Sequence, residues 1–387
     1  MTLAPIDGPL RRVAILSRSL GLGGTERVTA FLAHAFAEAG WEVTVITLED
    51  EPDVHALPTG IGRIRLALQK PSAHVLDGLA NNLHRAWRLR RVLQDVRPDL
   101  VISLQMTVNC LALLASFGLH APVVISDRVS PASNPLERGV WRWAVKLLYP
   151  RSARLVAVSA GVLAERSWMP QRKRLAIPNA VQLDHAPAAG DPILQPDAAP
   201  HILALGRLVP QKGFDVLLEA FGLLAARFPA WNLTIIGEGP ERKALEAKSR
   251  RLGLGGRAHL PGAAKAPGPL LRAAAEKGAI FAFPSRFEGF PNVLIEALAA
   301  GLPVVASDCP HGPREILEGG AHGLLVPPES PEALAEALAS LMTDAARRAD
   351  LARRARARAE RYRPDRIAPL WLGLAEAVLA ERRTAQG

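Results

Sequence analysis

The sequence predicts an α/β protein built from two doubly wound, parallel-sheet domains. Short Val, Ile and Leu runs alternate with amphipathic stretches of helical length along most of the chain. Such alternation is typical of parallel strands joined by crossover helices. A segment rich in Pro and Ala, residues 184–200, interrupts the series and reads as a linker. Because 387 residues are enough for two domains, we expect two Rossmann-like domains.

Each half of the chain supplies its own strands. In the first half we expect strands at residues 12–17, 42–48, 99–104, 122–126 and 154–158, with helices such as 26–39 and 79–96 between them. In the second half we expect strands at residues 201–206, 232–236, 257–260, 279–283, 303–306 and 323–326. The predicted domains are residues 1–185 and 186–365, followed by a C-terminal helical segment, 366–387.

Composition narrows the class of protein and its partners. Apolar residues make up 49% and charged residues 22%, as in globular proteins. Cys110 and Cys309 cannot build a disulfide framework or a zinc site, which favours a reducing compartment. No secretory signal and no apolar stretch of about 20 residues is visible, so a cytoplasmic location is expected. The net charge of +10 favours anionic partners, whereas 5% aromatic content without a recognition motif argues against nucleic acid.

The most informative segment carries two glutamates eight positions apart, Glu288 and Glu296. Glu288 follows the apolar run 279–284, a predicted buried strand, and Pro291 suits the first turn of a helix that carries Glu296. A helix start favours an anion, and carboxylates accept hydrogen bonds from hydroxyl groups. A phosphate that carries sugars on both sides fits this pattern.

A basic loop follows the expected strand 201–206. Its sequence runs from Gly206 to Gly213 and places Arg207 and Lys212 before a predicted helix. A guanidinium and an ammonium at such a position can clamp two phosphates. The alternative is an ordinary basic loop.

Together these segments resemble the retaining GT-B glycosyltransferases of family 4, the glycosyl transferases group 1. The string 284–306 follows the family pattern, and so do 206–213 and the Gly-Gly-x-Glu segment at Gly23 and Gly24. The string 308–317 is similar to that of bacterial enzymes of surface polysaccharide and lipid-linked oligosaccharide synthesis. The resemblance implies two domains facing across a cleft, with the last helix crossing back to the first domain.

The resemblance also implies roles for residues of this chain. Arg207 and Lys212 would hold the donor diphosphate and neutralise the leaving group, Glu288 would hold donor sugar hydroxyls, and Glu296 would accept from the ribose. The other expected donor-binding residues contribute mainly backbone: Gly23, Gly24, Gly206, Gly237, Pro261, Gly289, Phe290, Pro291, Asn292 and Val293.

The acceptor side is less well defined. Asp127 and Arg128 stand where relatives carry a Ser-Glu-Arg segment, so they are either acceptor-side residues or a salt-bridged loop anchor. Many family members carry a histidine after the strand that 99–104 would match, and this chain has none there. Gln105 or Asn109 could occupy that place, and we include Asn109 among the acceptor-side candidates.

No metal or other cofactor is expected. The sequence has no Asp-x-Asp and no paired histidine spacing, so Arg207, Lys212 and helix N-termini would replace a cation. The predicted function is metal-independent transfer, with retention, of a sugar from a nucleotide diphosphate sugar to a hydroxyl of a glycan or lipid-linked acceptor. UDP-hexose and UDP-N-acetylhexosamine are the expected donors. The alternative is a non-catalytic relative that binds anions or glycans, which would be marked by loss of Glu288, Arg207 or Lys212.

Two segments combine tryptophan with positive charge. Residues 136–151 contain Trp141, Trp143 and Tyr149 together with four basic residues, and residues 84–91 have a similar character. Each segment is either a helix that buries one face against the sheet or a helix that rests in a membrane interface. The second interpretation extends the expected location to peripheral contact with the anionic inner face of the cytoplasmic membrane.

Overall fold

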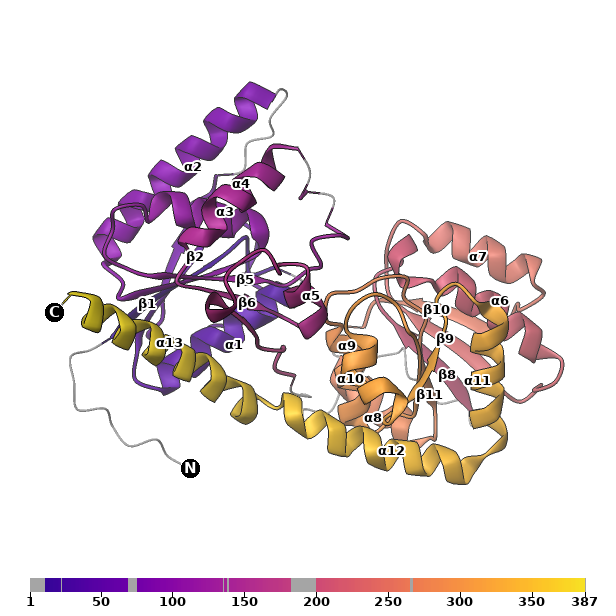
Figure 1. Ribbon diagram of the computed structural model, residues 1–387. Coiled ribbons are helices and arrows are strands. Elements are labelled where there is room, and N and C mark those ends of the chain that lie inside the picture. The colour runs from indigo at the N-terminus through magenta and orange to yellow at the C-terminus, as the bar shows by residue number, and fades with distance from the viewer. Residues whose placement is uncertain are drawn as a thin grey trace. The chain divides into compact units, whose positions relative to one another are not determined.

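The chain folds into two compact units, each of which is described by itself (Figure 1). The computed structural model describes residues 11–21, 23–68, 75–134, 136–137, 139–181, 200–264 and 267–386. The first unit comprises Met1–Ala180 and Pro364–Gly387, and the second comprises Val181–Arg363. Nearly all of the expected linker, 184–200, lies outside the described residues.

The first unit contains a seven-stranded parallel sheet with the order β3-β2-β1-β4-β5-β6-β7. Its strands are β1 Arg12–Ser17, β2 Glu42–Thr47, β3 Gly62–Arg65, β4 Leu100–Leu104, β5 Val123–Asp127, β6 Arg154–Ala157 and β7 Arg174–Ala176. The five strands expected from the sequence are confirmed. The two additional ones, β3 and β7, are the edge strands of the sheet, and both are short, half-exposed and arginine-containing. Since edge strands need no continuous apolar run, the pattern did not reveal them.

Helices cover both faces of this sheet. Ala14 and Leu16 of β1 point into the core shared with α2, α3 and α4, whereas Val13 and Ile15 point into the core shared with α1 and α13. This alternation is the two-residue period of a strand buried on both sides. The helices are α1 Gly24–Glu38, α2 Val75–Val96, α3 Met106–Ala115, α4 Val140–Leu148, α5 Ala160–Ala164 and α13 Pro364–Gln386.

The C-terminal helix α13 belongs to the core of the first unit. Trp371 is fully buried there with Ile367, beside residues of α1. Ion pairs join Arg11 to Glu376 and Arg154 to Glu381 and fasten the helix along the unit. The end of the chain therefore completes a domain formed by its beginning.

The second unit contains a six-stranded parallel sheet with the order β10-β9-β8-β11-β12-β13, and all six strands were expected. They are β8 His201–Leu205, β9 Asn232–Ile236, β10 Ala258–Gly262, β11 Ile280–Phe283, β12 Val304–Ser307 and β13 Leu324–Val326. The helices are α6 Phe214–Ala225, α7 Arg242–Arg251, α8 Pro267–Glu276, α9 Asn292–Ala300, α10 Pro313–Ile316, α11 Pro331–Thr343 and α12 Ala345–Ala359. Figure 1 shows α6 and α11 on one side of this sheet and α8 and α9 on the other.

The strand order places a topological switch point in each unit. It lies between β1 and β4 in the first unit and between β8 and β11 in the second, because the chain direction across the sheet reverses there. In open parallel sheets, ligands bind beyond the carboxyl ends of the strands at such points. The loops after β8 and β11 contain Lys212 and Glu288, so the fold brings these two segments together.

The structure contradicts the membrane-interface interpretation of residues 136–151 for two of the three aromatic side chains. Trp143 is exposed, but Trp141 packs against the core and Tyr149, which follows α4, is fully buried. Helical spacing explains this, since Trp141, Val145 and Leu148 share the inward face of α4. Within the described part of the chain, no helix combines the length and apolarity needed to cross a bilayer.

Candidate active site

The centre of the site is an ion pair between the loops after β8 and β11. Lys212 Nζ lies 2.6 Å from Glu288 Oε1, and the Glu288 side chain is only 8% exposed. The Lys212 ammonium also lies 5.5 Å from the centre of the Phe283 ring. Arg207 stands exposed on the same loop as Lys212. The structure therefore groups two cations and one carboxylate at the switch point of the second unit.

Hydrogen bonds from the side-chain amide of Gln211 hold the Glu288 loop in place. Gln211 Nε2 donates to the Phe287 carbonyl at 2.9 Å and more weakly to Glu288 Oε2 at 3.4 Å. In return, the backbone N–H of Arg286 donates to the Gln211 carbonyl at 2.8 Å. Gln211 therefore connects the loop that carries Arg207 and Lys212 directly to the loop that carries Glu288.

Arg286, on the loop after β11, also connects this loop to the segment that follows β8. Its guanidinium donates to both oxygens of Asp215, at 2.9 and 2.8 Å, and to the carbonyl of Pro210 at 2.5 Å. A third partner is Glu329 at 2.9 Å. Burial would raise the pKa of Asp215, but the bonds and charge of Arg286 outweigh it and lower that pKa. The carboxylate of Asp215 is thus stabilised in its charged form beside the site.

Two glycines permit close backbone approach around the site. Gly213 has φ of 63°, and a Cβ there would lie 2.1 Å from the carbonyl oxygen of Pro284. Gly237 has φ of 158°, and a Cβ there would lie 1.8 Å from the carbonyl oxygen of Gly206. Any other residue would push the loops after β8, β9 and β11 apart.

The second glutamate lies on helix α9. Glu296 is buried in the second turn of this helix, which begins at Asn292. Pro291 was expected inside the first turn, but it is the extended residue that precedes it. Phe290 is buried and packs edge-on against Tyr362 at a ring distance of 5.6 Å. Gly289 precedes Phe290, and Val293 follows Asn292 half-buried, so the whole segment lies at the start of α9.

The remaining donor-side candidates of the second unit lie near the ends of β8, β9 and β10. The N–H of Gly206 donates to the Ile236 carbonyl, and that of Gly237 donates to the Gly262 carbonyl. Pro261 is exposed on β10 where the strand register shifts. The N–H groups of Gly206 and Gly237 are thus used in pairing between neighbouring strands. These positions lie at the end of the sheet from which the loop of Lys212 and Arg207 also emerges.

In the first unit, Gly23 and Gly24 lie at the start of α1, beyond the end of β1. Glu26 is the glutamate of the Gly-Gly-x-Glu segment, and although no individual role was predicted for it, it is buried in the first turn of this helix. Burial raises the pKa of Glu26, and a hydrogen bond from Gln105 works in the opposite direction. Gln105 follows β4 with φ of 84°, a conformation that is rare outside glycine. Of the two candidates for the place of the missing histidine, Gln105 is the one at the switch point.

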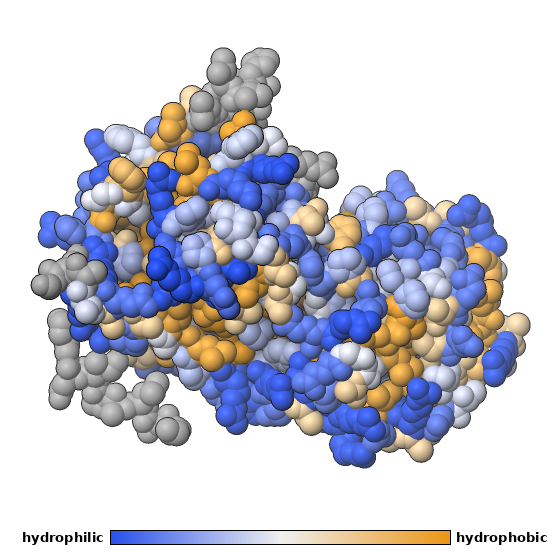
Figure 2. Space-filling view, in the orientation of Figure 1, coloured by the Kyte–Doolittle hydropathy of each residue, from blue (hydrophilic) through white to orange (hydrophobic). Residues whose placement is uncertain are grey.

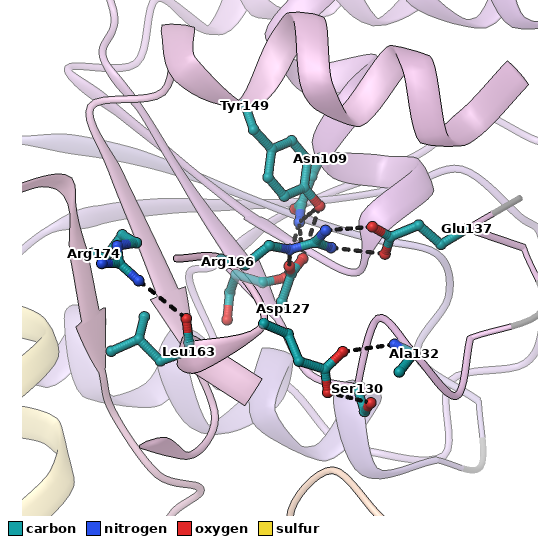
Figure 3. A network of polar contacts seen from close by, with 11 residues as sticks. Asn109, Asp127, Ser130, Ala132, Glu137, Tyr149, Leu163, Arg166 and Arg174 are labelled. Atoms are coloured by element: carbon teal, nitrogen blue, oxygen red, sulfur yellow. Dashed lines mark hydrogen bonds and ion pairs between the residues drawn. The ribbon is translucent and has the colours of Figure 1, made fainter. Parts of the chain in front are cut away.

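Asn109 instead belongs to a buried polar network (Figure 3). Its amide donates to the Ser126 carbonyl, to Asp127 Oδ1 and to the Tyr149 hydroxyl oxygen. Asp127 also accepts from the Tyr149 hydroxyl at 2.8 Å and from Arg166 Nε at 2.7 Å. Burial, followed by the charge of Asp127, raises the pKa of Tyr149 well above its usual value.

The network anchors the loop after β5. Arg166 joins Asp127 to Glu137, and Glu165 accepts from the Ser130 hydroxyl and the Ala132 N–H, both at 2.7 Å. Asp127 is 2% exposed, so its geometry matches the loop-anchor interpretation given above. Arg128 is also buried, donates to Ser126 Oγ and Asn179 Oδ1, and has a pKa lowered to about 9 by burial.

Comparison with known proteins shows the family to which the chain belongs. Residues 191–358 match the family described as Glycosyl transferases group 1, and residues 23–180 match the Glycosyl transferase 4-like domain. The chain belongs to the group 1 glycosyltransferases. Its two parallel-sheet units are those of the GT-B fold, and it is an enzyme of the transferase class.

One relative of this glycosyltransferase comes from Campylobacter jejuni subsp. jejuni serotype O:2 and is 27% identical over 369 residues. The match covers 93% of this chain and 98% of the relative, which is named N-acetylgalactosamine-N,N'-diacetylbacillosaminyl-diphospho-undecaprenol 4-alpha-N-acetylgalactosaminyltransferase.

Two solved structures share its fold. Sucrose-phosphate synthase from Thermosynechococcus elongatus has a TM-score of 0.81 at 21% identity, covering 96% of this chain and 100% of that one. Anabaena HepE, solved with UDP and glucose, has a TM-score of 0.76 at 21% identity, covering 94% and 99%.

Proposed function

We propose that this glycosyltransferase moves a hexose or N-acetylhexosamine from a UDP-sugar to a hydroxyl of a glycan or lipid-linked acceptor. The reaction retains the anomeric configuration and requires no metal. The observation that carries the proposal is the grouping of Arg207, Lys212 and Glu288 at the switch point of the second unit. Two cations and a carboxylate are the groups that a sugar diphosphate needs.

The cations act on the diphosphate. Arg207 is exposed and offers a planar fork to phosphate oxygens, while Lys212 supplies a compact charge close to Glu288. As the bond from the anomeric carbon to the phosphate oxygen breaks, negative charge builds up on the departing UDP. Fixed positive groups stabilise this charge in a partly buried site.

The glutamates position the donor. Glu288, held by Lys212 and Gln211, accepts hydrogen bonds from sugar hydroxyls next to the reacting carbon. Glu296, on α9, accepts from the ribose hydroxyls. The new bond forms between the acceptor oxygen and the anomeric carbon, and the acceptor proton passes to the departing phosphate. No acid and base pair of the glycoside hydrolase kind is required.

The acceptor assignment rests on chemistry and on the relatives. The name of the Campylobacter relative includes diphospho-undecaprenol, a lipid carrier, and the chain carries a net charge of +10. A basic protein is suited to an acceptor that is embedded in an anionic surface. We therefore include peripheral contact with an anionic membrane in the proposal.

A panel of donors tests the proposed activity. UDP- and GDP-linked sugars are screened by saturation-transfer NMR and by slow hydrolysis in the absence of acceptor. We expect one or a few UDP-sugars to show both binding and hydrolysis, and the released sugar to keep the donor's anomeric configuration when followed by proton NMR. Binding without any hydrolysis or transfer would favour the non-catalytic alternative. A GDP-sugar as the sole substrate would overturn the choice of nucleotide.

A further inference from the structure

Three neighbouring helices of the first unit expose large apolar side chains to solvent. Helix α3 packs against both α2 and α4, and all three cover the same face of the sheet. We call their solvent-facing side the outer helical face. Its exposed apolar residues, with their exposed fractions, are Leu83 58%, Trp87 45%, Leu114 41%, Phe117 69%, Val140 62%, Trp143 78% and Leu147 65%. Apolar side chains gathered in this way mark an interaction surface.

Helix α4 shows the pattern most clearly. Its inward stripe, including Val145 and Leu148, packs into the core. Its outward stripe is also apolar, since Val140, Trp143 and Leu147 recur at spacings of three and four residues. A helix with solvent on one side would normally carry polar residues there. This second stripe therefore has no role in the core.

The outward residues of α2 and of the turn after α3 continue this surface. Arg90 Nη1 donates to the carbonyls of Ala115 and Phe117, which ties the C-terminal part of α2 to the end of α3 and the turn that follows it. On α2, the Arg91 guanidinium lies 4.0 Å from the centre of the Trp87 ring. In the region of α2 and α4, Figure 2 shows hydrophobic residues interspersed with strongly hydrophilic ones.

The charge on the outer helical face is positive. The exposed basic residues are Arg88, Arg91, Arg142, Lys146 and Arg151. Among the described side chains of α2, α3 and α4, the one acid is Asp95. Glu137, just before α4, is already bound by Arg166. On the described side chains of this face, apolar groups mixed with cations and few acids match an anionic lipid surface better than a second protein.

A hollow beside α4 adds a place for a headgroup. It has a volume of about 290 Å³, and its lining includes the cations Arg142 and Lys146, Trp168 and two carboxylates, Glu165 and the Arg166-bound Glu137. The Lys146 ammonium lies 4.0 Å from the centre of the Trp168 ring. Glu165 is occupied by Ser130 and Ala132, so its charge is partly satisfied. Arg142 and Lys146 are thus positioned to meet a lipid phosphate next to the apolar stripe.

We infer that the outer helical face docks the protein on an anionic bilayer. Trp143, Leu147 and Phe117 enter the headgroup layer, and Arg142, Lys146 and Arg88 contact lipid phosphates. This rests on the proposed function only for its purpose, which is to bring the first unit to a lipid-linked acceptor. The docking itself is independent of sugar transfer.

Co-sedimentation of the full-length protein with vesicles tests the inference. The vesicles contain phosphatidylcholine alone or phosphatidylcholine with phosphatidylglycerol. We expect sedimentation with the anionic vesicles at low salt, little with the neutral ones, and release as salt increases. The variant with Trp143→Ser and Leu147→Ser should lose most of this binding, and so should Arg142→Gln with Lys146→Gln.

The chain offers a matched control for each pair. Leu223, on α6 of the second unit, is 59% exposed, so Leu223→Ser removes a similar side chain from another surface. Arg353→Gln on α12 removes an exposed cation elsewhere. Both controls should sediment like the unaltered protein. Because all these side chains are exposed, thermal melts should show that every variant remains folded.

Two outcomes would overturn the inference. One is an unaltered protein that stays in the supernatant with both kinds of vesicle at low salt. The other is a protein that sedimentation velocity shows to be a dimer and that Trp143→Ser with Leu147→Ser makes monomeric, which would assign the face to self-association. Donor hydrolysis is measured in parallel. We expect the docking variants to hydrolyse donor at the unaltered rate, so a failure of docking is distinguished from a failure of the transferase assignment.

Discussion

The ammonium of Lys212 lies 2.6 Å from the carboxylate of Glu288, so each partly neutralises the other. The same lysine is assigned to the donor diphosphate, and the same glutamate to the donor sugar. In the proposed mechanism, this ion pair links the residue that contacts the leaving diphosphate to the residue that contacts the donor sugar. We therefore expect a change to either residue to alter the surroundings of both groups.

Removal of either cation should abolish most transfer. We expect Lys212→Ala and Arg207→Ala each to raise the transition-state barrier by about 3 kcal/mol, roughly a hundredfold in rate, because developing charge loses its partner. Initial rates with the donor identified by the panel give the measurement. Lys277→Ala is the matched control, since this exposed lysine precedes β11 at the opposite end of the strand from Glu288. Near-normal turnover in either test variant would refute the diphosphate assignment.

Arg286 should act as a positioning residue for Glu288. We expect Arg286→Gln to lower kcat by roughly ten- to a hundredfold with a smaller change in the donor KM, because the bonds to Asp215 and Pro210 that fix the loop are lost. Arg286→Lys should restore only part of the rate, since an ammonium cannot pair with both oxygens of Asp215 in the same way. Arg353→Gln controls for loss of a surface ion pair. An equal loss of kcat in the control would contradict this role.

Glu26 should make stability depend on pH. Burial is the largest effect on this carboxyl and raises its pKa above the ordinary 4.5. The folded state therefore binds more protons than the unfolded state, and stability falls as pH rises from 4.5 through the folded pKa. We expect Glu26→Gln to gain stability relative to the unaltered protein over this interval, measured by urea unfolding at several pH values. Glu42→Gln, at an exposed position on β2, is the control. The prediction is wrong if the difference in free energy of unfolding between Glu26→Gln and the unaltered protein does not change with pH.

Transfer should continue in excess EDTA. In the proposed mechanism, Arg207 and Lys212 supply the positive charge that a divalent cation provides in metal-dependent enzymes. The rate with and without chelator, followed by addition of magnesium or manganese, is the measurement. Complete loss in EDTA with recovery on adding metal would contradict the proposed clamp.

The sequence predicted the position of a site residue best where that residue directly follows a recognisable strand. The six strands of the second unit are short apolar runs that end in loops, and the candidate residues Lys212 and Glu288 follow two of them. A parallel sheet brings the carboxyl ends of adjacent strands together, so β8 and β11 bring these two residues into contact. Their proximity was therefore predictable once both strands were recognised.

Other features depend on contacts that no local pattern records. Asp215 and Arg286 are 71 positions apart in the chain, and nothing near either residue indicates that they pair. Tyr149 looked like an interfacial aromatic because of the basic residues around it, yet its hydroxyl is needed inside the Asp127 network. The sequence offered both Gln105 and Asn109 for the place of the missing histidine. Only the fold shows that Gln105 is the residue that hydrogen-bonds to Glu26.

The position of Trp371 constrains the order in which the two units can complete their folding during synthesis. Its ring lies in the core of the first unit, although the second unit, Val181–Arg363, is translated before it. All six strands of the second sheet leave the ribosome before α13 does, and domains generally fold as units. The second unit can therefore acquire its native packing while the first still lacks part of its core. Until α13 has been synthesised, the second unit is therefore attached to a first unit that lacks Ile367 and Trp371 in its core.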